Sequence, residues 1–92
     1  MLHADAVNRT TSNAVQTINE RINEKDAEAS KIAHIIRKND KVRKQAIALS
    51  NYRAAARYAE DMEALRSKLK AIITERDALR AQLVQAYYHT GK

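Results

Sequence analysis

The sequence predicts an all-α protein whose long amphipathic helices form a helical hairpin or coiled coil, completed by self-association. Two observations support this fold class. The 92 residues include no proline and only one glycine, Gly91, so the usual residues for strand bends and tight turns are missing. Apolar residues also recur three and four positions apart, which is the spacing of helices that pack side by side.

Residues 1–12 are predicted to be a flexible leader, because they show little apolar periodicity and run into a series of residues that favour helix starts. A single helical domain is expected over 13–92, with its first helix beginning near Asn13. The apolar stripe of this helix has one charged exception, Lys25. Its apolar members are Val15, Ile18, Ile22, Ala29, Ile32 and Ile36.

The most regular stripe lies in the segment 62–88, near the end of the chain. It also follows a seven-residue repeat, and it also has one charged member, Arg76. A lysine or asparagine at such a position commonly fixes the register or the number of helices, and an arginine can lay its aliphatic stem along the seam. The stripe consists of Met62, Leu65, Leu69, Ile72, Arg76, Leu79 and Leu83.

The two stripes are out of phase, so the helix must be interrupted between Ile36 and Met62. The segment 37–40 has the stronger local signals for a break: two basic residues, then Asn39 to end a helix and Asp40 to cap the next. We therefore predict a turn near 39–40. Ser50–Asn51 is the second candidate, and one continuous helix remains a third possibility.

A turn near 39–40 has consequences for both charge and length. It places the acidic group of residues 20–28 opposite Arg53 and Arg57, a favourable match. It also leaves the stripe from Met62 onward without a partner helix in its own chain. A lone apolar stripe is poorly stable in water, so the segment 62–88 is predicted to pair with a second copy, in parallel or antiparallel orientation.

No catalytic, metal or cofactor site is expected. The chain has no cysteine and three scattered histidines, and one terminal glycine cannot build a phosphate-binding loop or a nucleophile elbow. Glu20, Glu24 and Glu28 share a helix face at four-residue spacing, but solvated carboxylates explain them better than a metal site does, because the Glu-x-x-His pairs of di-metal bundles are missing. The protein is therefore predicted not to be an enzyme.

The net charge of +6 is concentrated in the middle of the chain. Residues 31–58 contain eight Lys or Arg and one acid, Asp40. A solvated face that keeps the protein in solution is the simplest interpretation, and a binding patch is the functional one. The residues predicted to bind a partner are Lys31, Arg37, Lys38, Lys41 and Lys44.

An acidic protein surface is the preferred partner for this patch. Nucleic acid is the alternative, supported by Tyr52 and Tyr58 among the arginines of the segment 31–58. No membrane partner is expected, because Trp and Phe are absent. Tyr87 and Tyr88 are further candidates for an interface, or one of them for a staple at the end of the coil.

The sequence thus favours a small cytoplasmic protein that acts by protein–protein interaction, as an adaptor or regulator of a larger partner. The cytoplasmic expectation rests on a start without the pattern of a secretory signal and on the lack of any apolar run near the roughly 18 residues that span a bilayer.

Overall fold

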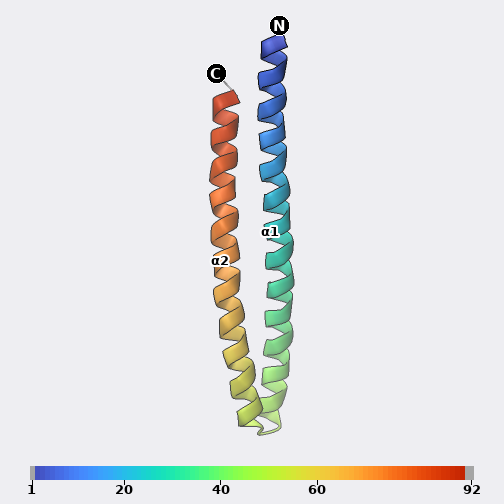
Figure 1. Ribbon diagram of the computed structural model, residues 1–92. Helices are drawn as coiled ribbons and strands as arrows, with labels where there is room; N and C mark the ends of the chain where they lie inside the picture. The colour runs from blue at the N-terminus through green and yellow to red at the C-terminus, as the bar shows by residue number, and fades with distance from the viewer. Residues whose placement is uncertain (1, 91–92) are drawn as a thin grey trace.

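The computed structural model describes the backbone of residues 2–90 and the side chains of residues 13–88. Two helices, α1 (Leu2–Ala48) and α2 (Tyr52–Thr90), lie antiparallel and side by side along almost their whole length (Figure 1). The molecule measures 73 × 14 × 13 Å, the shape of a single two-helix rod. The predicted all-α hairpin is confirmed.

The reversal occurs at residues 49–51, between Ala48 and Tyr52. Ser50 takes the left-handed conformation, with a φ of 57°. The amide of Asn51 donates to the carbonyl of Ala46, and that of Ser50 donates to Ile47, which together form a Schellman motif. Asn51 then caps α2, since its side-chain Oδ1 accepts from the amide of Ala54. Ser50 and Asn51 thus end one helix and begin the next.

The predicted turn near 39–40 is wrong, and the second candidate at Ser50–Asn51 is the observed one. Asn39 and Asp40 lie inside α1, where both are half-buried. A turn there would leave much of the second stripe exposed, whereas a turn at 49–51 gives it a partner over its whole length. Burial of that stripe outweighs local preferences for a helix end, which amount to about 1 kcal/mol or less per residue.

Residues 1–12 were predicted to precede the first helix as a leader. The structure instead begins α1 at Leu2, so the expected helix start near Asn13 is also wrong. The side chains of this segment lie outside the described residues.

One continuous seam of side chains joins the two helices. Its positions advance by alternating steps of three and four, and each of them is buried or half-buried. In α1 the seam comprises Val15, Ile18, Ile22, Lys25, Ala29, Ile32, Ile36, Asn39, Arg43 and Ala46. In α2 it comprises Ala55, Tyr58, Met62, Leu65, Leu69, Ile72, Arg76, Leu79, Leu83 and Ala86.

The stripe from Met62 to Leu83 therefore packs against α1 of the same chain. Met62 is only 2% exposed, the lowest value among the buried apolar side chains, and Ile72 and Leu79 are also buried. The expectation that this stripe lacks an internal partner is wrong, because it depended on the turn near 39–40. Within the described residues, neither helix has an apolar stretch long enough to cross a membrane.

Candidate functional site

The two charged exceptions to the apolar stripes, Lys25 and Arg76, lie at the same level of the hairpin. Each reaches a carboxylate on the opposite helix: Lys25 Nζ lies 2.6 Å from Glu75 Oε2, and Arg76 Nη1 lies 3.2 Å from Asp26 Oδ1. Asp26 follows Lys25 in sequence and Glu75 precedes Arg76, so the two ion pairs cross the seam side by side. We call these four residues the charged layer.

Both cations of the charged layer have pKa values above their ordinary range. The hydrogen bond to Glu75 is the main cause for Lys25, and the hydrogen bond to Asp26 is the main cause for Arg76. Desolvation by burial opposes both shifts without reversing them. The layer therefore holds its charges in partly exposed ion pairs, whose contribution to stability is modest.

Arg76 fits its seam position because its stem and head occupy different surroundings. The head extends to Asp26 and, at 3.3 Å, to its neighbour Asp77. Its Nε lies buried, and within the described residues it is the one buried side-chain nitrogen or oxygen without a hydrogen-bond partner. An arginine can span this distance from seam to edge, and the acceptors that it finds belong to its own chain.

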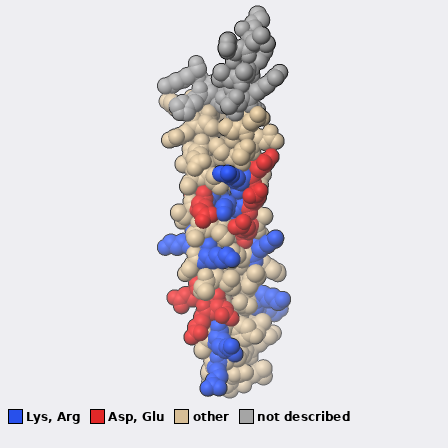
Figure 2. Space-filling model, in the orientation of Figure 1, with Lys and Arg blue, Asp and Glu red and all other residues tan. Residues whose placement is uncertain are grey.

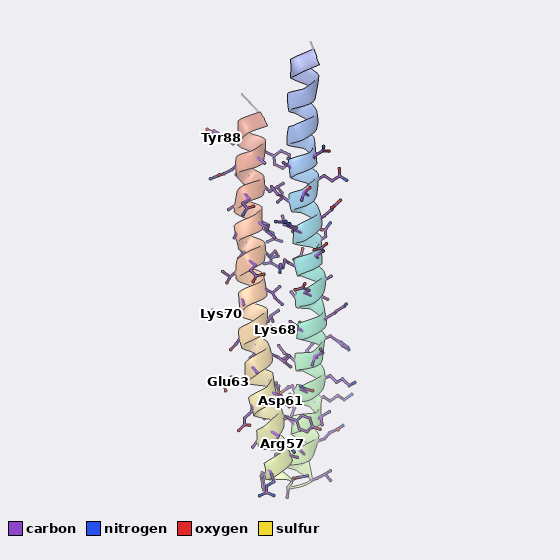
Figure 3. The ribbon with its side chains drawn as sticks, in the orientation of Figure 1. Arg57, Asp61, Glu63, Lys68, Lys70 and Tyr88 are labelled. Carbon is purple, nitrogen blue, oxygen red and sulfur yellow. The ribbon has the colours of Figure 1, made fainter. Side chains whose placement is uncertain are left out.

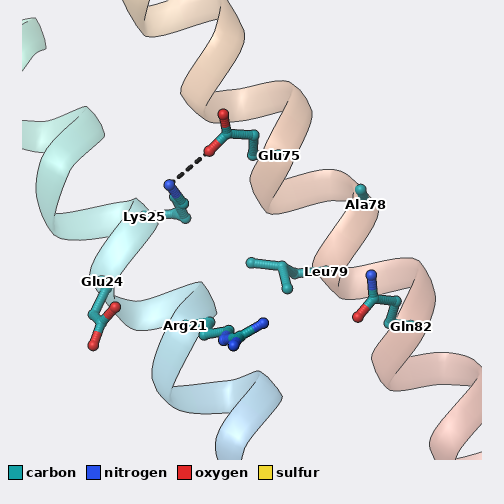
Figure 4. Close-up of a pocket in the computed structure, with 7 residues that line it drawn as sticks. All are labelled: Arg21, Glu24, Lys25, Glu75, Ala78, Leu79 and Gln82. Carbon is teal, nitrogen blue, oxygen red and sulfur yellow. Dashed lines mark ion pairs between the residues drawn. The ribbon is translucent and has the colours of Figure 1, made fainter.

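An open groove of about 440 Å³ runs beside the charged layer (Figure 4). The Lys25–Glu75 ion pair forms one end of it, and side chains of both signs line it. Because its walls carry both charges, the groove favours neither anions nor cations. Its lining residues are Arg21, Glu24, Lys25, Glu75, Ala78, Leu79 and Gln82.

The predicted basic patch forms the outer face of α1, on the side away from the seam. We call Lys31, Arg37, Lys38, Lys41 and Lys44 the basic face, and all five side chains are exposed. Lys44 forms an ion pair with Asp40, at 3.2 Å. Among the described residues, the other four have no ion-pair partner. The structure thus brings together the residues that the sequence singled out, although they follow one helix rather than surround a turn.

Asp40, the one acid of the segment 31–58, already pairs with two cations of its own helix. Arg43 donates two hydrogen bonds to Asp40 Oδ1, at 2.9 and 3.3 Å, from one turn further along the same helix. These bonds, followed by the one from Lys44, lower the pKa of the Asp40 carboxyl. Asp40 therefore anchors Arg43 at the edge of the seam and leaves most of the basic face unneutralised.

The acidic group of residues 20–28 does not face Arg53 and Arg57, contrary to expectation. The turn at 49–51 places it beside the far half of α2, where Asp26 pairs with Arg76. No group of three or more His, Asp or Glu side chains that could hold a metal ion occurs within the described residues.

The two tyrosines near the end of α2 are both more than half exposed. Figure 3 shows Tyr88 on the side of α2 that faces away from α1. Neither is buried as a staple, so both remain candidates for an interface. In Figure 2, the surface just below the grey end is uncharged, whereas the rest of this face carries interspersed charges of both signs.

Two features were missed by reasoning from the sequence. Lys25 and Arg76 were recognised as exceptions, but their pairing within one layer was not; their equal distance from Ser50–Asn51 along the chain was the available signal. The exposed apolar side chains around the turn were also missed.

Comparison with protein-family models, with curated proteins and with solved structures finds no match for this chain.

Proposed function

We propose that this chain is a non-enzymatic cytoplasmic helical hairpin that acts by protein–protein interaction, as an adaptor or regulator of a larger partner. The basic face of α1 is the contact surface, and an acidic protein surface is the partner. The basic face runs along one helix from Lys31 to Lys44, about 20 Å at 1.5 Å per residue, so a short acidic segment, such as an acidic helix, suits it best.

The unpaired cations of the basic face are the observation that supports this proposal most directly. Lys31, Arg37, Lys38 and Lys41 are exposed and have no ion-pair partner among the described residues. Neither the apolar seam nor the ion pairs of the hairpin use these four cations. They also lie on the face opposite the seam, so a partner can bind there without disturbing the packing of the hairpin.

Nucleic acid is the second candidate, and one observation favours it. Tyr52 is exposed next to Arg53, and further along α2 a small hollow is lined by Ala54, Arg57, Tyr58 and Asp61. An exposed aromatic ring next to an arginine can stack on an unpaired base. This arrangement suits single strands better than a duplex.

Self-association is a further part of the proposal, in a form that the hairpin allows. The side chains from Met62 to Leu83 are engaged with α1, so a dimer that uses them must exchange α2 helices between two chains. Such an exchange reproduces every seam contact in the partner. Sedimentation at rising concentration tests it, and a single species of monomer mass throughout would refute it.

The test of the basic face compares two triple variants that remove equal charge. Replacing Arg37, Lys38 and Lys41 with glutamine should abolish binding to polyglutamate, measured by fluorescence anisotropy. The matched control replaces Arg66, Lys68 and Lys70, three exposed cations of α2 without ion pairs among the described residues. It should retain most of the binding. Equal losses in the two variants would show that net charge alone is responsible.

A parallel titration with single-stranded and duplex DNA separates the two candidates. Binding to DNA should be weak and should decline steeply with salt, because each neutralised phosphate releases counterions. Tight binding to DNA that survives physiological salt, with polyglutamate bound poorly, would make nucleic acid the partner instead.

A further inference from the structure

The turn of the hairpin exposes a cluster of apolar side chains that the fold does not use. Leu49, in the turn itself, is 81% exposed, and Tyr52, at the start of α2, is 66% exposed. Ile47, in the last turn of α1, is 42% exposed. None of the three belongs to the seam. Exposed apolar side chains gathered at one end of a narrow molecule indicate a contact that the single chain does not provide.

The charges around this cluster are of one sign. Residues 41–59, which we call the turn end, contain five basic residues and no acidic one. The acids that flank this range are Asp40, which is held by Arg43 and Lys44, and Glu60 and Asp61 on α2. The five cations are Lys41, Arg43, Lys44, Arg53 and Arg57. The turn end therefore combines an exposed apolar tip with a positive collar.

The shape of the turn end decides which partner suits this combination. The backbone of the rod extends only 14 × 13 Å across its long axis, and the turn closes one end of it (Figure 1). A stable protein–protein interface needs about 800 Å² from each partner, more than such an end offers. A second copy docked tip to tip would bring two positive collars together. A membrane surface can accept an apolar tip without a pocket shaped to fit it. Its anionic headgroups also attract lysine and arginine side chains that lie close to the surface.

We propose that the turn end binds the surface of membranes that contain anionic lipids. Leu49, Ile47 and Tyr52 enter the headgroup region, where tyrosine is favoured at the boundary between water and hydrocarbon. Arg53, Lys44 and the other cations of the collar contact lipid phosphates. The sequence argued against a membrane partner because Trp and Phe are absent, but the turn at 49–51 exposes a leucine and a tyrosine instead. The site lies beyond the proposed function: it shares Lys41 and Lys44 with the basic face and needs none of Lys31, Arg37 and Lys38.

Sedimentation with phosphatidylcholine vesicles, with and without phosphatidylserine, tests the proposal. The unaltered chain should bind only the anionic vesicles. Replacing Leu49 and Tyr52 with serine should weaken this binding by at least about tenfold, since two apolar side chains no longer leave water. The matched control replaces Val84 and Tyr87, which are 64% and 56% exposed at the other end of the rod, and it should bind normally.

A fluorescence measurement tests insertion without relying on serine variants. The chain has no cysteine, so Leu49→Cys provides one attachment site for an environment-sensitive dye. Its emission should shift to the blue with anionic vesicles, and a dye on Val84→Cys should not shift. Several results would overturn the proposal: no binding by the unaltered chain, equal binding to neutral vesicles, equal loss in both serine pairs, or no spectral shift at position 49. Leu49-dependent binding to polyglutamate without binding to vesicles would assign the turn end to an acidic protein.

Failure of this proposal and failure of the proposed function can be told apart. The triple variant at Arg37, Lys38 and Lys41 retains Leu49, Tyr52 and four cations of the collar. It should still give the blue shift at position 49 after it has lost binding to polyglutamate. Loss of the shift in that variant would show that adsorption depends on the basic face, and would overturn insertion through the turn end.

Discussion

In the middle of the hairpin, Lys25 and Arg76 reach carboxylates on the opposite helix, whereas nearer the turn Arg43 pairs with Asp40 of its own helix. Both regions place a cation at a seam position. In the charged layer, the ion pairs link α1 to α2 and are satisfied only when the two helices are in register. The Asp40–Arg43 pair forms within one helix and is compatible with any partner.

This difference shows that a charge in an apolar stripe has two distinct uses. The charged layer favours one arrangement of helices, because any shift would leave two partly buried cations, Lys25 and Arg76, without partners. The Asp40–Arg43 pair only neutralises a charge at a seam position. In the half of the hairpin near the turn, stability comes from apolar burial. Met62, which the register places opposite Asn39, supplies much of that burial.

The largest loss of stability is expected from Met62→Ala. Removing a side chain that is only 2% exposed should reduce the free energy of unfolding by about 2–5 kcal/mol, through lost burial and a cavity. Urea denaturation followed by circular dichroism measures it. Val84→Ala, at an exposed site of the same helix, is the control, with a change of about 0.5 kcal/mol or less. A small effect at Met62 would refute the view that burial stabilises the half near the turn.

The second largest loss of stability should come from disrupting the Asp26–Arg76 ion pair, which crosses the charged layer. Asp26→Arg should lower the melting temperature, because it sets an arginine against Arg76. Adding Arg76→Asp should restore most of the loss by rebuilding the pair in reverse. A double variant no more stable than the worse single variant would contradict a direct interhelical interaction. The same exchange between Asp40 and Arg43 should leave the pairing of the helices unaffected.

Replacing Lys25 and Arg76 together with leucine should separate specificity from stability. Apolar side chains in place of ion pairs should leave the melting temperature unchanged or raised. The charges that disfavour other helix pairings would be gone, so species of higher mass should appear in sedimentation at micromolar concentration. An unchanged mass distribution would mean that the turn at 49–51 specifies the arrangement without help from the charged layer.

The smallest effect is the dependence of stability on pH, and it should differ in sign between the two regions. The pKa of Asp40 is lowered from its ordinary 3.8, so its contribution is present above that pH and lost as pH falls through the folded value. The pKa of Lys25 is raised from 10.5, so its contribution is present below that pH and lost as pH rises through the folded value. Thermal melts should therefore show Asp40→Asn flattening only the acid limb, and Lys25→Gln only the alkaline limb.

The spacing of apolar residues predicts most of the seam correctly, whereas the local signals for a helix end predict the turn in the wrong place. The segment 37–40, with Asn39 and Asp40, has more local signals for a helix break than Ser50–Asn51 has. Local signals are worth little beside the burial of a whole stripe, and that burial depends on which residues lie opposite. Asn39 was therefore predicted to end a helix, although Asn39 and Arg43 both continue the seam in polar form.

The helical class, the seven-residue period and the basic face of α1 can be predicted from the sequence alone. Each follows from residues close together in the chain: the lack of proline, the near lack of glycine, and the spacing of apolar and basic side chains along one helix. The position of the turn, the partner of the stripe from Met62 to Leu83 and the shared layer of Lys25 and Arg76 depend on how the two helices pack. These features join residues far apart in sequence, and their free energy arises only after the helices have paired.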